Sequence, residues 1–366
     1  MQFTSLKWMC VVLTSSLVGC SQITPLPEHQ VALSQTYPLQ TQGNYQVLSW
    51  DNYVNDQQLI NLVDLALVSN QDLKIASLRI HEAQAAYGIQ RAELFPNIGG
   101  NAGMERNHVP ADLSYVGREM TTSQYSVGLG MNQWELDLWG RIRSLNEAAL
   151  QQFFAVESNV QAVRNSLIQQ TVLSYLTLSE LDKRIYFAQR SVQNYEKSVR
   201  LFKRRYEVGA SSKVEYMQAK TMLSNGQALV TQLEKSRALT ANYLVQLVGQ
   251  PTSLHQTDLD QVTFKTGVLH TGLPSDLLLN RADIRASEAM LKSKHANINA
   301  ARAAFFPRIT LTGSLGTASA DLDGLFKSGS SVWSFAPSIS VPIFTAGRLK
   351  NNLILAEVRK DIGVAE

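Results

Sequence analysis

Apolar and polar residues alternate with a period of two in two short stretches that lie far apart in the chain. Residues 97–107 place Ile, Gly, Ala and Met on one face and Asn and Glu on the other, and residues 309–316 alternate Ile, Leu and Gly with Thr and Ser. This alternation predicts β-strands with one apolar face. A tilted strand crosses a bilayer in about nine to eleven residues, so both stretches are long enough to be transmembrane strands. A soluble hairpin that packs on helices is the alternative.

The two stretches belong to a repeated unit of helix, proline break, strand, loop, strand, glycine break and helix. The first copy is centred on residues 92–141 and the second on residues 303–348. Equivalent residues are 211 positions apart before the strands and 207 after them, as in Ala92 and Ala303, Pro96 and Pro307, Gly140 and Gly347, and Arg141 and Arg348. The duplication predicts four strands in all.

Apolar residues spaced by three and four predict helices on either side of these strands. One helix begins at Asp56, a suitable N-cap residue, and ends before Pro96, with a break at Ser69 and Asn70. A second runs from Ile142 to Val208 with a heptad seam. At 1.5 Å per residue this helix is about 100 Å long, and it is too long and too polar to lie within a bilayer.

A turn follows the long helix. Gly209 ends it, and Ser211 or Ser212 caps a return helix that finishes near Gly249 and Pro251. The return helix is about half as long as its partner, so we expect an antiparallel hairpin that projects into water.

The start of the chain has the pattern of a secretory signal. Lys7 precedes a short apolar run over residues 8–18, which cannot span a membrane as a helix. The sequence LVGC that ends at Cys20 resembles the lipobox of bacterial lipoproteins. That resemblance implies that residues 1–19 are removed, that Cys20 is lipidated, and that Ser21 favours transport to the outer membrane. The alternative is an ordinary signal peptide with a chance cysteine.

Composition excludes several classes of function. The chain has 366 residues, a formal charge of +3 and 17% charged residues without a polybasic run, so nucleic acid is an unexpected partner. Its other cysteine, Cys10, lies in the signal, so no disulfide is expected. The six histidines lack ligand spacing and no nucleophile has a recognisable partner, so we expect no metal, no cofactor and no enzyme. Glu135, Asp137 and Asp321 are interpreted as solvated or lumen-facing carboxylates.

Several motifs occur in an order that resembles a known family. They are NRADIRASE and INAARAAFFPRITLTGS before the second strand pair, WELDLWGR at residues 134–141 and VPIFTAGR at residues 341–348. The chain from Cys20 to Glu366 is similar to the TolC-like outer-membrane factors, and most similar to their lipidated multidrug-efflux branch. The segment RYEVGASSKVEYMQA resembles the hairpin tip of that family.

The resemblance implies an α+β membrane protein. Three protomers would each give four transmembrane strands to one 12-stranded β-barrel in the outer membrane, and long helical hairpins to a periplasmic α-barrel. A periplasmic adaptor and an inner-membrane pump of the resistance-nodulation-division type would be the partners. The tip residues implied to contact the adaptor are Val208, Gly209, Ala210 and Ser211.

The expected organisation follows the duplication. Residues 1–19 form the signal peptide, 20–55 a lipid-anchored tether, 56–251 the first structural repeat, 252–273 a connection and 274–366 a second repeat. The second repeat begins a helix at Arg348 but has no return helix, which predicts a C-terminally truncated member of the family. The chain is thus expected to be a passive efflux channel. A type I protein-secretion outlet and a lipid-anchored coiled-coil scaffold without a pore are the alternatives.

Overall fold

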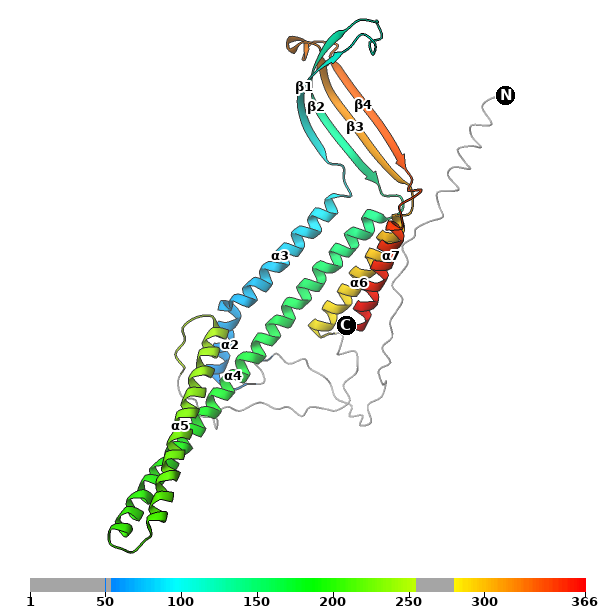
Figure 1. The fold of residues 1–366 in the computed structure, drawn as a ribbon. Coiled ribbons are helices and arrows are strands. Elements are labelled where there is room, and N and C mark those ends of the chain that lie inside the picture. Colours follow the sequence, from blue (N-terminus) through cyan, green and yellow to red (C-terminus); the bar gives the residue numbers. More distant parts are fainter. Residues whose placement is uncertain (1–49, 51–53, 255–279) are drawn as a thin grey trace, which may run out of the picture. The chain divides into compact units, whose positions relative to one another are not determined.

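The computed structural model describes Trp50, residues 54–254 and residues 280–366 (Figure 1). Cys20, the expected signal peptide, and most of the expected tether and connection lie outside the described residues. In chain order the elements are α2 (Gln57–Ser69), α3 (Gln71–Ala92), β1 (Ile98–Val109), β2 (Met120–Leu136), α4 (Arg141–Glu207), α5 (Lys213–Val248), α6 (Ala282–Ala303), β3 (Arg308–Ser319), the short 3₁₀ helix η4 (Leu322–Gly324), β4 (Ser331–Ser340) and α7 (Arg348–Ala365).

The chain divides into two compact units. Within the described residues, the first unit comprises His81–Val156 and Arg285–Glu366, and the second comprises residues of 31–80 and 157–284. Helices α3, α4 and α6 each contribute residues to both units. The four expected strands all belong to the first unit.

The first unit contains one antiparallel sheet with the strand order β1-β2-β3-β4 (Figure 1). Each strand pairs with its neighbour in the chain, so β2 and β3 join the two copies of the repeat even though the whole helical hairpin lies between them in sequence. Gly128 and Gly316 face each other at this junction, and a Cβ atom on Gly316 would lie 2.3 Å from the carbonyl oxygen of Val127. Glycine is required there because the two backbones approach closely.

Helix α6 packs on the first turns of α4 in the same unit. Its buried face consists mostly of alanine, including Ala289, Ala296 and Ala300. The Ser293 hydroxyl donates to the Ala148 carbonyl oxygen at 2.8 Å, which places one turn of α6 directly against α4. Small side chains allow this close approach.

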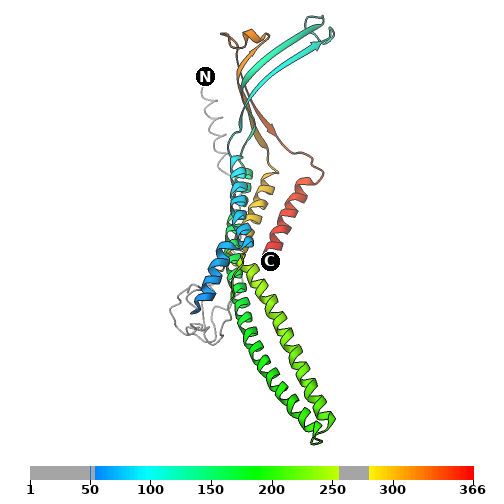
Figure 2. The same ribbon diagram turned by 90° about the vertical axis from the view of Figure 1, so that its left-hand side faces the viewer.

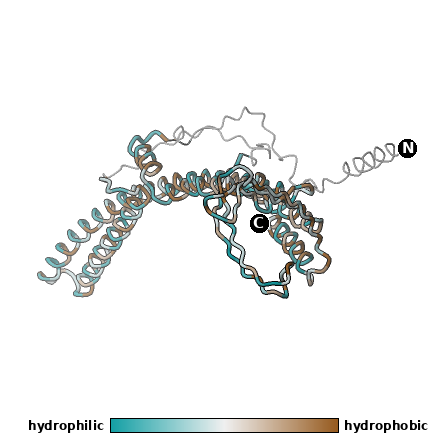
Figure 3. Tube along the Cα trace, turned by 90° about the horizontal axis from the view of Figure 1, so that it is seen from above, coloured by the Kyte–Doolittle hydropathy of each residue, from teal (hydrophilic) through white to brown (hydrophobic). Residues whose placement is uncertain are grey.

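The second unit is organised around the antiparallel pair of α4 and α5, which lie side by side in both side views (Figures 1 and 2). Helix α4 has 67 residues and α5 has 36, which confirms the expected long helix and its shorter return. Hydrophobic and hydrophilic segments alternate along both helices (Figure 3). Such alternation is typical of helices that bury one face and expose the other.

The core of this unit lies where α2 and α3 meet the hairpin. Leu59, Val63, Tyr175 and Leu244 are almost completely buried there. The expected break between α2 and α3 is confirmed at Asn70, whose side chain accepts a hydrogen bond from the Leu73 amide and donates one to the Leu247 carbonyl oxygen, each at 2.9 Å. One side chain therefore caps α3 and ties it to the end of α5.

The other expected caps of this unit are also confirmed. Asp56 accepts hydrogen bonds from the amides of Gln58 and Leu59 and from the hydroxyl of Tyr175, the last at 2.6 Å. Gly249 ends α5 in the left-handed conformation with φ 78°. A Cβ atom at that position would lie 2.4 Å from the Ser69 carbonyl oxygen, so the close contact between α5 and the α2–α3 break also requires glycine.

Candidate functional site: a two-faced sheet and a hairpin turn

The register of the sheet collects most of the large apolar residues of the four strands on one face. Leu129, Leu315 and Trp333 lie directly beside one another across β2, β3 and β4, with 59%, 62% and 73% of each residue exposed. Other residues on this face are Ile98, Ala102, Met104, Tyr125, Val127, Met131, Trp134, Leu136, Ile309, Leu311, Phe335, Pro337 and Ile339. Such a large exposed apolar surface requires a partner other than water.

The opposite face is made mostly of small and polar residues. Ser126, Gly128 and Gly130 of β2 share it with Thr310, Thr312 and Ser314 of β3, and with Ser334 and Ser338 of β4. The hydroxyl groups of Ser314 and Ser334 are 2.7 Å apart across the β3–β4 pair. A wall that is apolar outside and polar inside is the pattern of a transmembrane barrel around water.

A β-bulge in β2 keeps this separation intact near the end of the strand. Met131 pairs with Gly313 but Trp134 pairs with Leu311, so two residues of β2 stand opposite one residue of β3. Gln133 has φ 50° and its amide donates to the Thr312 hydroxyl oxygen at 3.3 Å. The extra residue changes the phase of the alternation, and it thereby places Trp134 on the apolar face.

The bulge also places Glu135 on the polar face, where two arginines bind it. Arg141 at the start of α4 donates from Nε and Nη2 to the two carboxylate oxygens, each at 2.8 Å, and Arg308 at the start of β3 donates from Nε to Oε2 at 3.0 Å. The Glu135 side chain is only 9% exposed. The hydrogen bonds between the Arg141 guanidinium and Glu135 raise the pKa of Arg141. The ion cluster therefore joins the end of β2 to both β3 and α4.

An aromatic contact reinforces the same junction. The Trp139 ring stacks on Phe306 with the ring centroids 5.1 Å apart, and its indole N–H donates to the Pro307 carbonyl oxygen at 2.7 Å. Asp137 accepts from the Arg143 amide at 2.8 Å near the start of α4. Three carboxylates were expected to be solvated or lumen-facing. Asp321 is exposed and Glu135 lies on the polar face of the sheet, but Glu135 and Asp137 bind arginine and their side chains are only 9% and 11% exposed.

The hairpin turn that joins α4 to α5 has the expected geometry. Gly209 has φ 79°, and Ala210 donates its amide to the Arg205 carbonyl oxygen at 2.7 Å, which closes the end of α4. Ser212, and not Ser211, caps α5 in a capping box with Glu215. Hydrogen bonds from the Ser211 hydroxyl and the Ser212 amide lower the pKa of Glu215.

The turn leaves the four expected tip residues accessible. Val208 is 78% exposed, and Gly209 and Ala210 are also exposed, whereas Ser211 is half-buried. Among the described residues no helix has both the length and the apolar composition to cross a membrane. The same residues contain no group of three or more His, Cys, Asp or Glu side chains that could hold a metal ion.

Comparison with known proteins agrees with the two-faced sheet. The family model for outer membrane efflux proteins matches residues 62–250 and 273–366. The chain belongs to the outer membrane efflux protein family. Members of this family are channels of the outer membrane and not enzymes, and the chain is accordingly an outer-membrane channel component of an efflux system.

Individual relatives cover nearly the whole chain. It is 39% identical over 376 residues to the toluene efflux pump outer membrane protein TtgI of Pseudomonas putida, an alignment that covers 100% of this chain and 79% of the relative. It is 39% identical over 320 residues to the outer membrane protein OprJ of Pseudomonas aeruginosa, covering 87% of this chain and 67% of the relative.

Solved structures give the same result. The open state of the MtrE outer membrane channel of Neisseria gonorrhoeae matches with a TM-score of 0.81 and 35% identity, over 94% of this chain and 78% of that one. A membrane protein from Pseudomonas aeruginosa matches with a TM-score of 0.86 and 36% identity, over 94% of this chain and 79% of that one. The fold class expected from the sequence is confirmed.

Proposed function

We propose that three copies of this chain close one twelve-stranded barrel, with four strands from each copy. Within the described residues β1 and β4 are the two edge strands of the sheet, and each has only one neighbour. An unpaired strand edge cannot remain in hydrocarbon, because its backbone N–H and C=O groups would have no partners. Pairing β4 of one copy with β1 of the next satisfies both edges and closes the ring.

The observation that carries the proposal is the separation of an apolar and a polar face across all four strands, which the bulge in β2 preserves. The face with Leu129, Leu315 and Trp333 contacts lipid, and the face with Ser314 and Ser334 lines a water-filled lumen. The protein is then a passive conduit, which moves solutes without any chemistry of its own. The alternative, a lipid-anchored coiled-coil scaffold without a pore, would not need a sheet with one large apolar face.

The helical part of the proposal concerns the periplasm. The α4–α5 hairpin extends toward an adaptor, which Val208, Gly209, Ala210 and Ser211 contact, and an inner-membrane pump of the resistance-nodulation-division type supplies the energy. Relatives named for toluene and solvent efflux support the export of apolar toxic compounds rather than of a secreted protein. Removal of residues 1–19 and lipidation of Cys20 belong to the same proposal.

The membrane part is tested by removing the lipid. In a Cys20→Ala variant carrying a cleavable signal peptide without a lipobox, the only remaining attachment is the sheet. We expect no fatty-acid labelling of this variant, but full resistance to extraction from outer membranes with alkaline carbonate. Quantitative release of the variant by carbonate would favour the scaffold and contradict the barrel.

The transport part is tested by complementation. The chain is expressed in cells that keep their adaptor and pump but lack an outer-membrane channel, and accumulation of a fluorescent efflux substrate is measured. We expect accumulation to fall to the level of the channel-positive parent when the chain is extended with a complete second helical hairpin, and to fall less with residues 1–366 alone. Unchanged accumulation, with the protein correctly embedded, would contradict the role in efflux.

A further inference from the structure

Positive charge is concentrated at the end of the α4–α5 hairpin, defined here as residues 196–220. This segment holds seven basic and three acidic residues, a net charge of +4, while the whole chain of 366 residues has a net charge of +3. The rest of the chain is therefore close to neutral. All seven basic residues are exposed: Lys197, Arg200, Lys203, Arg204, Arg205, Lys213 and Lys220.

The acidic residues of the hairpin end leave most of this charge uncompensated. Glu207 approaches only Lys203, at 3.9 Å, and the Glu215 carboxylate accepts hydrogen bonds from the Ser211 hydroxyl and the Ser212 amide in the cap of α5. Arg200, Arg204 and Lys213 form no ion pair with any described residue; we call these three the basic rim. Fixed, unpaired charges of one sign attract a surface of the opposite sign.

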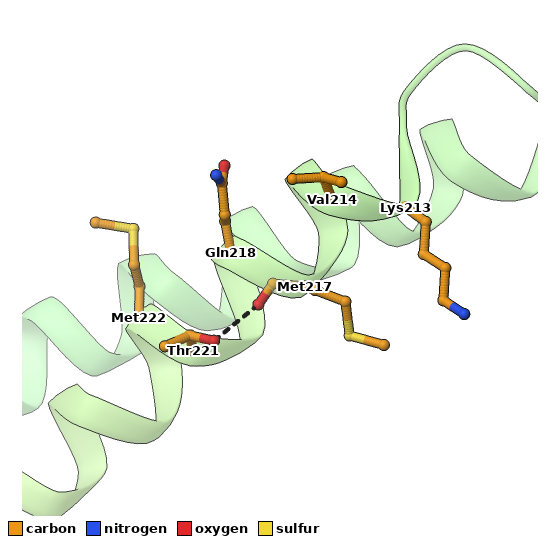
Figure 4. A pocket seen from close by; sticks show the side chains of 6 residues that line it. All are labelled: Lys213, Val214, Met217, Gln218, Thr221 and Met222. Carbon is orange, nitrogen blue, oxygen red and sulfur yellow. Dashed lines mark hydrogen bonds between the residues drawn. The ribbon is translucent and has the colours of Figure 1, made fainter.

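An exposed apolar stripe adjoins the basic rim. On α5, Val214, Met217 and Met222 are 64%, 45% and 55% exposed, and all three lie on the half of the helix that faces away from Tyr216 and Ala219. Together with Lys213, Gln218 and Thr221 they line an open depression (Figure 4). Gln218 and Met222 project from one side of the helix, and Lys213 and Met217 project from the other (Figure 4).

The remaining side of α5 is already occupied. Tyr216 stacks on Tyr206 of α4 with the ring centroids 6.1 Å apart, and Ala219 is buried. The stripe is therefore a second face, which the hairpin itself does not use. Methionines adapt their shape to a partner surface, and an apolar centre with a charged rim is the usual composition of a protein interface.

We propose that the hairpin end binds an acidic partner, an inference that rests on the proposed function. The partner is a helical segment of the adaptor that presents apolar side chains to the stripe of Val214, Met217 and Met222, with carboxylates around them that meet the basic rim. The argument for a protein rather than a lipid surface is that the stripe contains no Trp, Phe or Leu, which membrane-surface helices use for anchoring. Charge complementarity accelerates and orients this docking.

The test uses the full chain in detergent and two synthetic helical hairpins. Both probes carry leucines at the turn, flanked by glutamates in one probe and by lysines in the other. We expect the chain to bind the glutamate probe and not the lysine probe. Raising the salt from 0.1 M to 1 M shortens the Debye length from about 10 Å to about 3 Å, so it should weaken the binding several-fold.

Charge reversal locates the contact. Arg204→Glu with Lys213→Glu should weaken binding of the glutamate probe about tenfold, because two attractive exposed pairs become repulsive. The matched control, Arg184→Glu with Lys235→Glu, makes the same change in charge at exposed positions outside the hairpin end and should bind like the wild type. Restored affinity of the reversed chain for the lysine probe would be the strongest support.

Two results overturn the inference. Equal binding of both probes, or binding that is insensitive to salt and to the reversal, would show that charge does not select the partner. Stronger binding to phosphatidylglycerol vesicles than to the glutamate hairpin, lost in the reversed variant, would assign the hairpin end to a lipid surface. Neither result affects the proposed channel, which is tested by carbonate resistance and by export. Loss of those two properties in the wild type would reject the channel, whichever probe binds.

Discussion

Deleting Gln133 should leave the sheet intact, although a deletion inside a transmembrane strand is normally disruptive. Without Gln133, Asn132 pairs with Thr312 and Trp134 keeps its partner Leu311. Every side chain then stays on its present face. The left-handed φ of 50° at Gln133 costs about 1 kcal/mol, and its amide hydrogen bond to Thr312 contributes about 1 kcal/mol, so the net change is close to zero.

The matched control deletes Met131. The strand becomes shorter by the same single residue and the same regular ladder can form, but Asn132 then lies opposite Gly313 on the apolar face. Loss of the lipid-facing methionine side chain costs about 1.5–3 kcal/mol. Transfer of the asparagine amide into hydrocarbon adds about 4–8 kcal/mol. The sum is comparable with the entire stability of a typical domain, roughly 5–15 kcal/mol.

The Met131 deletion cannot avoid this cost by keeping the bulge, because Tyr125, Val127 and Leu129 would then turn to the polar face. The assay measures the fraction of each variant in outer membranes that resists extraction with urea and shows heat-modifiable mobility. We expect the Gln133 deletion to resemble the wild type and the Met131 deletion to be degraded or extracted. Equal insertion of the two deletions would refute the assignment of the faces to lipid and lumen.

Two further predictions concern the helices. Asn70→Ala removes the cap of α3 and leaves the Leu247 carbonyl oxygen without its partner. The variant should therefore lower the free energy of unfolding of the helical region by about 2–3 kcal/mol, measured by thermal unfolding followed by circular dichroism, whereas Gln71→Ala at the neighbouring exposed position should have little effect. At the turn, Gly209→Asn should keep export, because asparagine tolerates the left-handed conformation. Gly209→Asp has the same side-chain shape but adds a negative charge, and it should abolish export with normal membrane insertion. Equal export by both variants would remove Gly209 from the adaptor contact.

The helices could be predicted from the sequence because local chemistry determines where they begin and end. Asp56 and Ser212 supply cap oxygens, Pro96 lacks an amide proton, and Gly209 and Gly249 adopt a positive φ at no steric cost. Each of these residues affects only the backbone within a few positions along the chain. None of them depends on how distant parts of the chain pack.

The bulge coincides with a change in the apolar–polar alternation that can be seen in the sequence of β2. In β2 the apolar residues occupy odd positions from Tyr125 to Met131 and even positions at Trp134 and Leu136. Such a change of phase indicates one extra residue, so the bulge could have been predicted from this stretch alone. Its consequence for Glu135 could not, because the burial of that carboxylate depends on Arg308, 173 positions away.

The duplication places the two charges of the ion cluster in different copies of the repeat. Glu135 corresponds to Pro342 in the second copy, at the offset of 207, and Arg308 corresponds to Asn97 in the first copy, at the offset of 211. The acid is therefore present only at the end of β2, and the base only at the start of β3. A junction between β4 and β1 of two copies would bring together Pro342 and Asn97, which cannot form this ion pair. We infer that the cluster favours the pairing of β2 with β3 over the pairing of either strand with β4 or β1 of another copy.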